Sequence, residues 1–129
     1  MFAMPENVPD PQDPATFERS RLDWDELGRA PHAGLLDWYR QLVALRRSHA
    51  ELGAGSLEPV TATGDDTSRW LVVHRPPFAI VANLSPDAQV VPLDAPEGEL
   101  VLASAEGIEC GDGGVAMPGW ALAVVRRRS

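Results

Sequence analysis

Lysine is absent from the sequence, and all 11 of its Lys or Arg positions are arginine. With 19 aspartates and glutamates, the formal net charge is −8. Nucleic acid is not an expected partner, because phosphate binding needs a concentrated basic surface and an acidic chain repels phosphate. The one basic run, at residues 126–128, is interpreted as a solvated tail.

Cysteine and long apolar runs are scarce as well. The single cysteine, Cys110, excludes a disulfide within the chain and any zinc site built on several cysteines. No apolar run approaches the roughly 20 residues of a membrane-spanning helix, and residues 1–6 lack the charged-then-apolar order of a secretory signal. The sequence therefore predicts a cytoplasmic protein without membrane contact.

Motifs for metals or cofactors are missing too. His32, His49 and His74 are too scattered for a local metal site, and no acid-rich calcium loop occurs. Cys110 has no base pattern beside it and is interpreted as an inert small side chain. No cofactor and no metal are therefore predicted.

Residues 1–31 are rich in proline and aspartate. Each residue before a proline is pushed toward extended geometry, so this stretch is predicted to be a stiff extended loop. Within it, Asp13 and Pro14 suit the cap and first position of a short helical turn.

Residues 32–53 change to a helical pattern. Apolar side chains recur at helical spacing from Leu35 to Leu45, and Gly53 and Gly55 suit the helix end. The apolar face is wide and must be buried against something.

Residues 54–129 show a period of two with frequent turn signals, such as residues 63–66 and 110–113. The strand candidates are residues 69–75, 78–84, 89–93, 99–103, 114–117 and 120–126. The predicted fold is mainly β with one long N-terminal α-helix. It is an antiparallel β-sandwich preceded by the extended Pro-rich loop.

The string Pro-Asp-Pro-Gln-Asp-Pro at residues 9–14, followed by Thr16 and Phe17, is the most specific motif. It resembles the malto-oligosyltrehalose trehalohydrolase family, within the α-amylase superfamily of glycoside hydrolases. The Tyr-Arg-x-Leu pattern that continues to Arg46 resembles the last barrel helix of that superfamily, and residues 115–125 resemble the closing hairpin of its C-terminal β-sandwich.

The resemblance implies a C-terminal fragment with three parts. Residues 1–31 would be a loop from the active-site face of the barrel, residues 32–53 the last barrel helix, and residues 54–129 the C-terminal sandwich. Family members hydrolyse the α-1,4 bond beside the terminal trehalose unit of maltooligosyl trehalose. They use an aspartate nucleophile, a glutamate acid/base and a second aspartate, which lie upstream of this stretch. No residue here matches those three, so the chain alone is predicted to be inactive.

One hypothesis is that acidic residues of this chain form a catalytic pair of their own. A working pair needs burial that raises one pKa, and an open loop offers little apolar shielding, so solvated surface charge is favoured. Asp10, Gln12 and Asp13 remain candidates for sugar contact, since carboxylates and amides pair well with hydroxyls. The alternative is that they tie the loop to itself through Asx turns.

The helix face of Leu35, Tyr39 and Leu42 is expected to be partly buried against the sandwich. Its remainder would bind the missing barrel or a second copy of the chain. Trp38, Trp70 and Trp120 are interpreted as packed aromatics. The rival hypothesis is a non-catalytic module that binds α-glucans such as maltooligosaccharides through surface aromatics. A third is a plain interaction protein.

Overall fold

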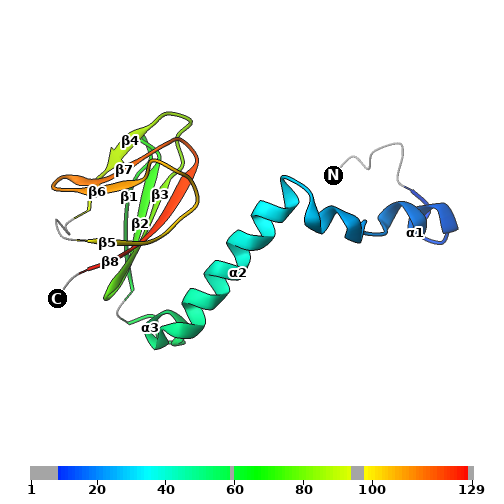
Figure 1. The fold of residues 1–129 in the computed structure, drawn as a ribbon, viewed down its shortest axis with the longest axis horizontal. Helices are drawn as coiled ribbons and strands as arrows, with labels where there is room; N and C mark the ends of the chain where they lie inside the picture. Colours follow the sequence, from blue (N-terminus) through cyan, green and yellow to red (C-terminus); the bar gives the residue numbers. More distant parts are fainter. Residues whose placement is uncertain (1–8, 59, 94–97, 128–129) are drawn as a thin grey trace, which may run out of the picture. The chain divides into compact units, whose positions relative to one another are not determined.

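The computed structural model describes residues 9–58, 60–93 and 98–127 (Figure 1). The chain divides into two compact units, one reaching to Leu36 and the other starting at Asp37. The helices are α1 (Pro14–Ser20), the 3₁₀ helix η1 (Trp24–Gly28), α2 (His32–Ser48) and α3 (Ala50–Gly53). The strands are β1 (Thr61–Asp65), β2 (Trp70–Arg75), β3 (Phe78–Asn83), β4 (Gln89–Val91), β5 (Glu99–Ala103), β6 (Glu109–Gly111), β7 (Gly114–Met117) and β8 (Ala121–Arg126).

The first unit contains two short helices where an extended loop was predicted. The short helix at Asp13 is confirmed: Asp13 caps α1, its Oδ1 accepts from the Ala15 N–H (2.9 Å), and Pro14 occupies the first turn. Asp23 caps η1 in the same way by accepting from the Asp25 N–H (3.0 Å). Besides the predicted turn at Asp13, the stretch thus contains a second short helix, η1, which the extended-loop prediction missed; each aspartate satisfies an N–H group that a helix start leaves free.

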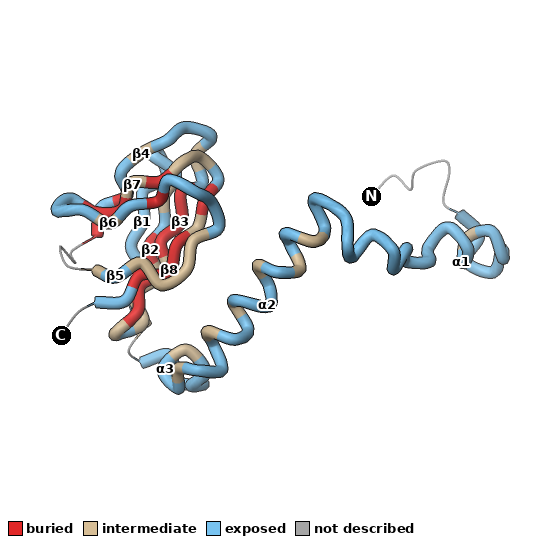
Figure 2. The backbone as a smooth tube through the Cα atoms, viewed as in Figure 1, coloured by how far each residue is buried: buried red, intermediate tan, exposed pale blue. Residues whose placement is uncertain are grey.

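No described residue up to Leu36 is buried (Figure 2). A segment of this size without a buried apolar side chain has little hydrophobic energy to offset its ordering entropy. Its helices therefore depend on local capping, and burial must come from outside the unit.

The single long helix predicted for residues 32–53 is not what the structure contains. Helix α2 ends at Ser48, His49 is extended (φ −127°, ψ 111°), and α3 follows as a separate turn. The His49 ring meets the Phe78 ring edge-on with centroids 4.8 Å apart. This contact joins the break between the two helices to the first residue of β3.

The second unit is an antiparallel structure of two sheets, which is consistent with the predicted sandwich. The five-stranded sheet has the order β1-β2-β3-β8-β5, and the three-stranded sheet the order β4-β7-β6. Strands β1 and β6 cover residues that were predicted as turns. Every residue of β1 is exposed, so its pairing with β2 left no alternating apolar pattern in the sequence.

The core lies between the two sheets (Figure 2). Valines from both sheets are fully buried in it: Val72, Val81, Val91, Val115 and Val125. Strand β8 is covered on both faces, because α2 and α3 supply apolar side chains on its outer side. Within the second unit, the outer side of the sheet therefore contacts α3 and the C-terminal part of α2.

Arg75 of β2 connects α3 and the residues after it to this sheet through hydrogen bonds. Its guanidinium donates to the carbonyl oxygens of Glu51, Ala54 and Ser56, the last at 3.3 Å. Carbonyl groups at a helix end have no partner within the helix, and a positive charge there is favourable. The strand therefore supplies the cap that α3 lacks in its own sequence.

Asn83 is a fully buried polar residue that joins the β3–β4 and β7–β8 connections. Its Nδ2 donates to the carbonyl oxygens of Asp87 (2.9 Å) and Pro118 (2.8 Å). Its Oδ1 accepts from the Ser85 N–H (3.0 Å) and from Gln89 Nε2 (2.7 Å). The amide is fully satisfied, so it orients the connections at this end of the five-stranded sheet.

Candidate functional site

The three predicted sugar-contact residues all lie exposed at the start of the first unit. Asp10 Oδ1 accepts from the Gln12 N–H (2.9 Å), and the Asp13 N–H donates to the Asp10 carbonyl (3.1 Å). These bonds form the Asx turn that was the alternative interpretation, and Asp13 is the cap of α1. The carboxylates of Asp10 and Asp13 each accept a backbone N–H through Oδ1. Their Oδ2 atoms accept no such bond from the described residues. Sugar contact by Asp10, Gln12 and Asp13 stays a prediction.

The other acids of this unit do not assemble a shielded pair. Asp23 and Asp25 are exposed, and so is Glu26, whose carboxylate lies 3.7 Å from His32 Nε2. Among the described residues of this unit, no carboxylate has the apolar burial that general acid catalysis requires. The interpretation as solvated surface charge agrees with this exposure.

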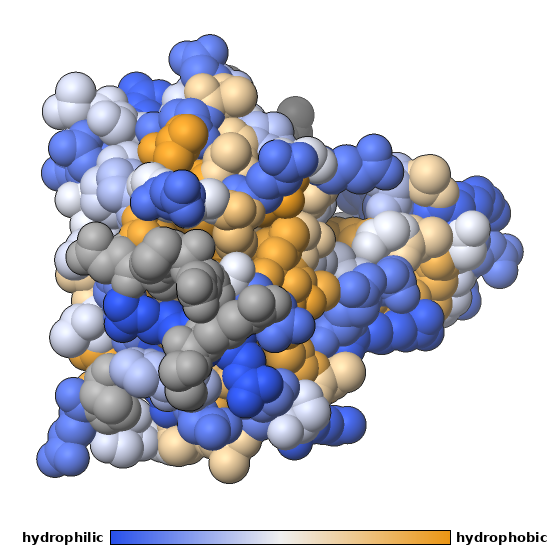
Figure 3. Space-filling model, turned by 60° about the vertical axis from the view of Figure 1, so that its left-hand side comes forward, coloured by the Kyte–Doolittle hydropathy of each residue, from blue (hydrophilic) through white to orange (hydrophobic). Residues whose placement is uncertain are grey.

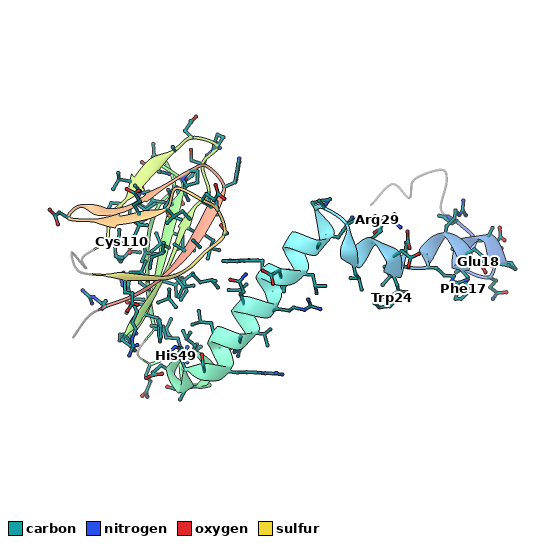
Figure 4. The ribbon with its side chains drawn as sticks, viewed as in Figure 1. Phe17, Glu18, Trp24, Arg29, His49 and Cys110 are labelled. Atoms are coloured by element: carbon teal, nitrogen blue, oxygen red, sulfur yellow. The ribbon has the colours of Figure 1, made fainter. Side chains whose placement is uncertain are left out.

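Large apolar side chains lie on the surface of the first unit. Phe17 is 66% exposed and Trp24 is 70% exposed, and both project from their helices in Figure 4. Leu22 and Leu27 are exposed as well. Aromatic side chains in proteins are mostly buried. Several exposed ones on one small unit are typical of a surface that binds a partner.

Helix α2 carries two apolar stripes. Leu42 and Leu45 face the sheet, where they line a pocket of about 240 Å³ with Ile80 and Val124. Tyr39 and Val43 lie on another side of the helix, are exposed, and border a shallow hollow of about 350 Å³.

The predicted face of Leu35, Tyr39 and Leu42 is therefore divided. Leu42 belongs to the sheet-facing stripe and is half-buried, whereas Leu35 and Tyr39 are 56% and 59% exposed. A helix turns about 100° per residue, so Tyr39 is offset from Leu42 by about 60°, whereas Leu35 is offset from it by only about 20° and lies two turns earlier. Apolar side chains among charged ones are visible on the face shown in Figure 3.

The tryptophans differ in their surroundings. Trp70 packs against the core, as predicted, and Trp38 is half-buried. The packed interpretation is wrong for Trp120, which is 68% exposed and has a φ of 55°. Strand β8 begins one residue later, at Ala121, because Gly119 and Trp120 form the turn that precedes it.

Cys110 is half-buried on β6 and packs against the core (Figure 4). Burial raises the pKa of its thiol above the usual 9.0, because the charged thiolate is poorly solvated there. The stabilisation from this shift is present below the unfolded pKa and is lost as pH rises through the folded pKa.

We expect Cys110 to react slowly with iodoacetamide at neutral pH, at least about tenfold more slowly than in the unfolded chain, because the thiolate is the reactive form. The rate should climb as pH rises past 9.0. Mass spectrometry of timed reactions, with and without guanidinium, measures both rates. Equal rates in the two conditions would contradict the raised pKa.

Residues 9–58, 60–93 and 98–127 contain neither a metal-binding cluster nor a membrane-spanning helix. Within these ranges, no group of three or more His, Cys, Asp or Glu side chains is placed to hold a metal ion. No helix in them combines the length and apolar character needed to cross a membrane.

Comparison with known proteins identifies the second unit. Residues 55–124 match the family described as a domain of unknown function, DUF3459. The chain belongs to this family. The match spans β1 to β7 and the first part of β8, and it leaves out the helices α1, η1, α2 and α3.

Relatives extend the DUF3459 match toward the N-terminus. Proteins named malto-oligosyltrehalose trehalohydrolase are 44% identical over 125 residues in Brevibacterium helvolum and 39% identical over 121 residues in Mycobacterium tuberculosis H37Rv. These alignments cover 95% and 94% of this chain. Each covers 20% of the relative, so the chain spans about a fifth of the length of these proteins.

This DUF3459 chain is thus a homologue of the C-terminal portion of malto-oligosyltrehalose trehalohydrolases, which confirms the family resemblance. The 44% identity to an Arthrobacter ramosus protein of the same name, over 124 residues, agrees with it.

One group of surface residues was missed by sequence reasoning. Arg69, Leu84 and Trp120 are all exposed at one end of the five-stranded sheet. The sequence signal that could have separated Trp120 from the strand is the Pro118-Gly119 pair, a turn signature that ends one strand before the next begins.

Proposed function

We propose that this chain acts as the C-terminal portion of a malto-oligosyltrehalose trehalohydrolase, an enzyme that releases trehalose by hydrolysing the α-1,4 bond beside it. The second unit would support a catalytic barrel carried on another segment. The first unit would contribute to the rim of the substrate site. The chain alone would not cleave a glycosidic bond, and its single cysteine suits a reducing, cytoplasmic compartment.

The observation that carries this proposal is the uncovered apolar surface. Phe17, Trp24, Leu35 and Tyr39 are all more than half exposed. Large apolar side chains exposed on each unit in this way are typical of surfaces that a partner covers. A barrel that covers them would provide the burial that the first unit lacks, and the same surface would join two copies of the chain when no barrel is present.

The rim role concerns Asp10, Gln12 and Asp13. In barrels of this class, active sites are built by loops that follow the strands. The Asx turn and the helix cap hold both aspartates in defined positions, so each could direct its second carboxylate oxygen at a sugar hydroxyl. Held geometry is what a substrate-positioning loop requires.

A chimera tests the proposal. This chain replaces the matching C-terminal fifth of the Brevibacterium helvolum relative, and trehalose release from maltooligosyl trehalose is measured by chromatography. We expect the chimera to release trehalose and the isolated chain to release none, since retaining hydrolysis needs two carboxyls held about 5–5.5 Å apart.

Tyr39→Glu is the matched interface variant of the chimera. A charge buried without a partner is expected to destabilise the chimera by about 2–4 kcal/mol. Gln41→Lys adds a charge at an exposed position outside the Tyr39 stripe and keeps a donor for Asp37 Oδ2, to which the Gln41 amide donates (2.6 Å), so it should leave the stability nearly unchanged. Thermal unfolding compares the two variants. Trehalose release by the isolated chain, or a folded but inactive chimera, would refute the proposal.

The second candidate function is a non-catalytic α-glucan-binding module. The observation that favours it is the exposure of Trp120 on the sheet unit. An exposed tryptophan offers a flat apolar face that can stack on a sugar ring.

A further inference from the structure

Three consecutive strand ends meet at one end of the five-stranded sheet. The Leu84 N–H donates to the Arg69 carbonyl (2.8 Å), and the Trp120 N–H donates to the Ser85 carbonyl (2.9 Å). Trp70, Asn83 and Ala121 are register partners in the adjacent row. The backbones of Arg69, Leu84 and Trp120 therefore stand side by side, with Arg69 and Trp120 two strand spacings, or about 10 Å, apart.

The backbone at this sheet end is unusual. Arg69 and Trp120 both have a φ of 55°, a left-handed conformation that residues with a Cβ rarely adopt. Such a conformation is strained and persists only where the surroundings determine it.

The surroundings of both residues are fixed. Before Arg69, Asp65 accepts from the Ser68 N–H (2.5 Å), which closes the turn and lowers the pKa of the Asp65 carboxyl. Before Trp120, the buried Asn83 amide holds the Pro118 carbonyl (2.8 Å). These contacts hold the left-handed backbone in place, although the Trp120 side chain stays 68% exposed.

The side chains displayed there have complementary chemistry. Trp120 offers an exposed ring, Leu84 adds apolar surface at 47% exposure, and Arg69 offers several N–H donors. The exposed carboxylate of Asp87 lies on the same connection as Leu84 and adds acceptors. An exposed ring and an apolar side chain at the same sheet end as a donor fork match a neutral polyol ring, which has an apolar face and a polar edge.

We propose that this sheet end, defined by Arg69, Leu84 and Trp120, binds a neutral α-linked glucose oligosaccharide at a site separate from the rim residues of the first unit. One ring stacks on Trp120, and the Arg69 guanidinium donates to hydroxyls of the next ring. The choice of an α-glucan rests on the proposed function, whereas the location of the site rests on the geometry alone.

The test uses the whole 129-residue chain and maltotetraose as the probe. Nitrogen-edited NMR follows the indole N–H signals of the four tryptophans during titration. We expect the Trp120 indole signal to shift. Trp120→Asn, which keeps a residue that tolerates positive φ, should weaken binding by about tenfold or more, because stacking is lost.

Three comparisons make the result decisive. Trp24→Ala removes the matched exposed tryptophan of the first unit and should leave the affinity unchanged. Arg69→Asn should weaken binding by about threefold to tenfold. Binding should persist at high salt, because a neutral sugar forms no ion pair that salt could screen.

Some results would overturn the sheet-end site: no shift of any indole signal, a shift confined to Trp24, or binding lost with salt. The chimera separates this failure from that of the proposed function. A chimera that releases trehalose while maltotetraose leaves Trp120 undisturbed would retain the proposed function and discard this site.

Discussion

Replacing Gly119 with alanine is expected to destabilise the second unit by at least about 3 kcal/mol, at the upper end of the effect of overpacking. A Cβ at this position would lie 2.0 Å from the Pro86 carbonyl oxygen and 2.4 Å from its carbon. Both are backbone atoms, so they cannot move aside as a side chain would. The connection before β8 must therefore shift, and the bond from the Trp120 N–H to the Ser85 carbonyl (2.9 Å) would be strained with it.

Urea unfolding followed by circular dichroism measures the effect of Gly119→Ala. The matched control is Gly111→Ala, at the end of β6, where an added Cβ would meet no atom within 4 Å. That change should alter the free energy of unfolding by less than about 1 kcal/mol. If both variants unfolded at the same urea concentration, the close approach to Pro86 would have no energetic meaning.

Replacing Asn83 with alanine is the second large effect, a loss of about 3–4 kcal/mol in the free energy of unfolding. Asn83 is fully buried, and its removal leaves two carbonyl oxygens, those of Asp87 and Pro118, without their donor. The Ser85 N–H and the Gln89 side chain lose an acceptor at the same time. Desolvation that is no longer compensated makes the cost larger than that of one exposed hydrogen bond.

Thermal unfolding of Asn83→Ala can be compared with two further variants. Asn83→Asp keeps the shape but places a second oxygen against the Asp87 and Pro118 carbonyls, so it should be as destabilising as alanine at neutral pH. Ser85→Ala removes only an exposed acceptor for the Asp87 N–H (3.1 Å) and should cost under about 1 kcal/mol. A stable aspartate variant would show that the amide donor does not hold these connections.

Both positions bear on function as well as on stability. Gly119 directly precedes Trp120, and Asn83 holds the Pro118 carbonyl on the same connection. A variant at either site should therefore perturb the Trp120 conformation before it perturbs the core valines. Loss of maltotetraose binding without global unfolding in Asn83→Ala would link the buried amide to the exposed ring.

Local sequence patterns predicted those strands whose apolar residues are spaced according to their burial. Strands β2, β3, β5, β7 and β8 follow predicted segments closely, because their alternating or continuous apolar residues reflect burial between layers. The Asp13 cap was predictable for a similar reason, since an N-cap acts within a few residues of itself. The motif at residues 9–14 identified the family from side-chain identity alone, and the relatives confirm it.

The prediction failed where the determining partner is distant in sequence. Strand β1 exists because its backbone pairs with β2, yet every side chain in it is exposed and leaves no pattern. The break at His49 depends on Phe78, which lies 29 residues further along the chain. The predicted apolar face of α2 was divided because only the sheet determines which turn of the helix it contacts.

By itself, the sequence determined the family, the acidic and cysteine-poor character, and most of the strands, because each depends on residue identity or on short-range periodicity. Tertiary structure alone decided that Trp120 stands exposed in a left-handed conformation beside Leu84 and Arg69. It also decided that Asn83, the last residue of β3, is a buried hydrogen-bonding junction. The physical reason is that burial and hydrogen bonding between strands arise only when segments far apart in the chain are brought together.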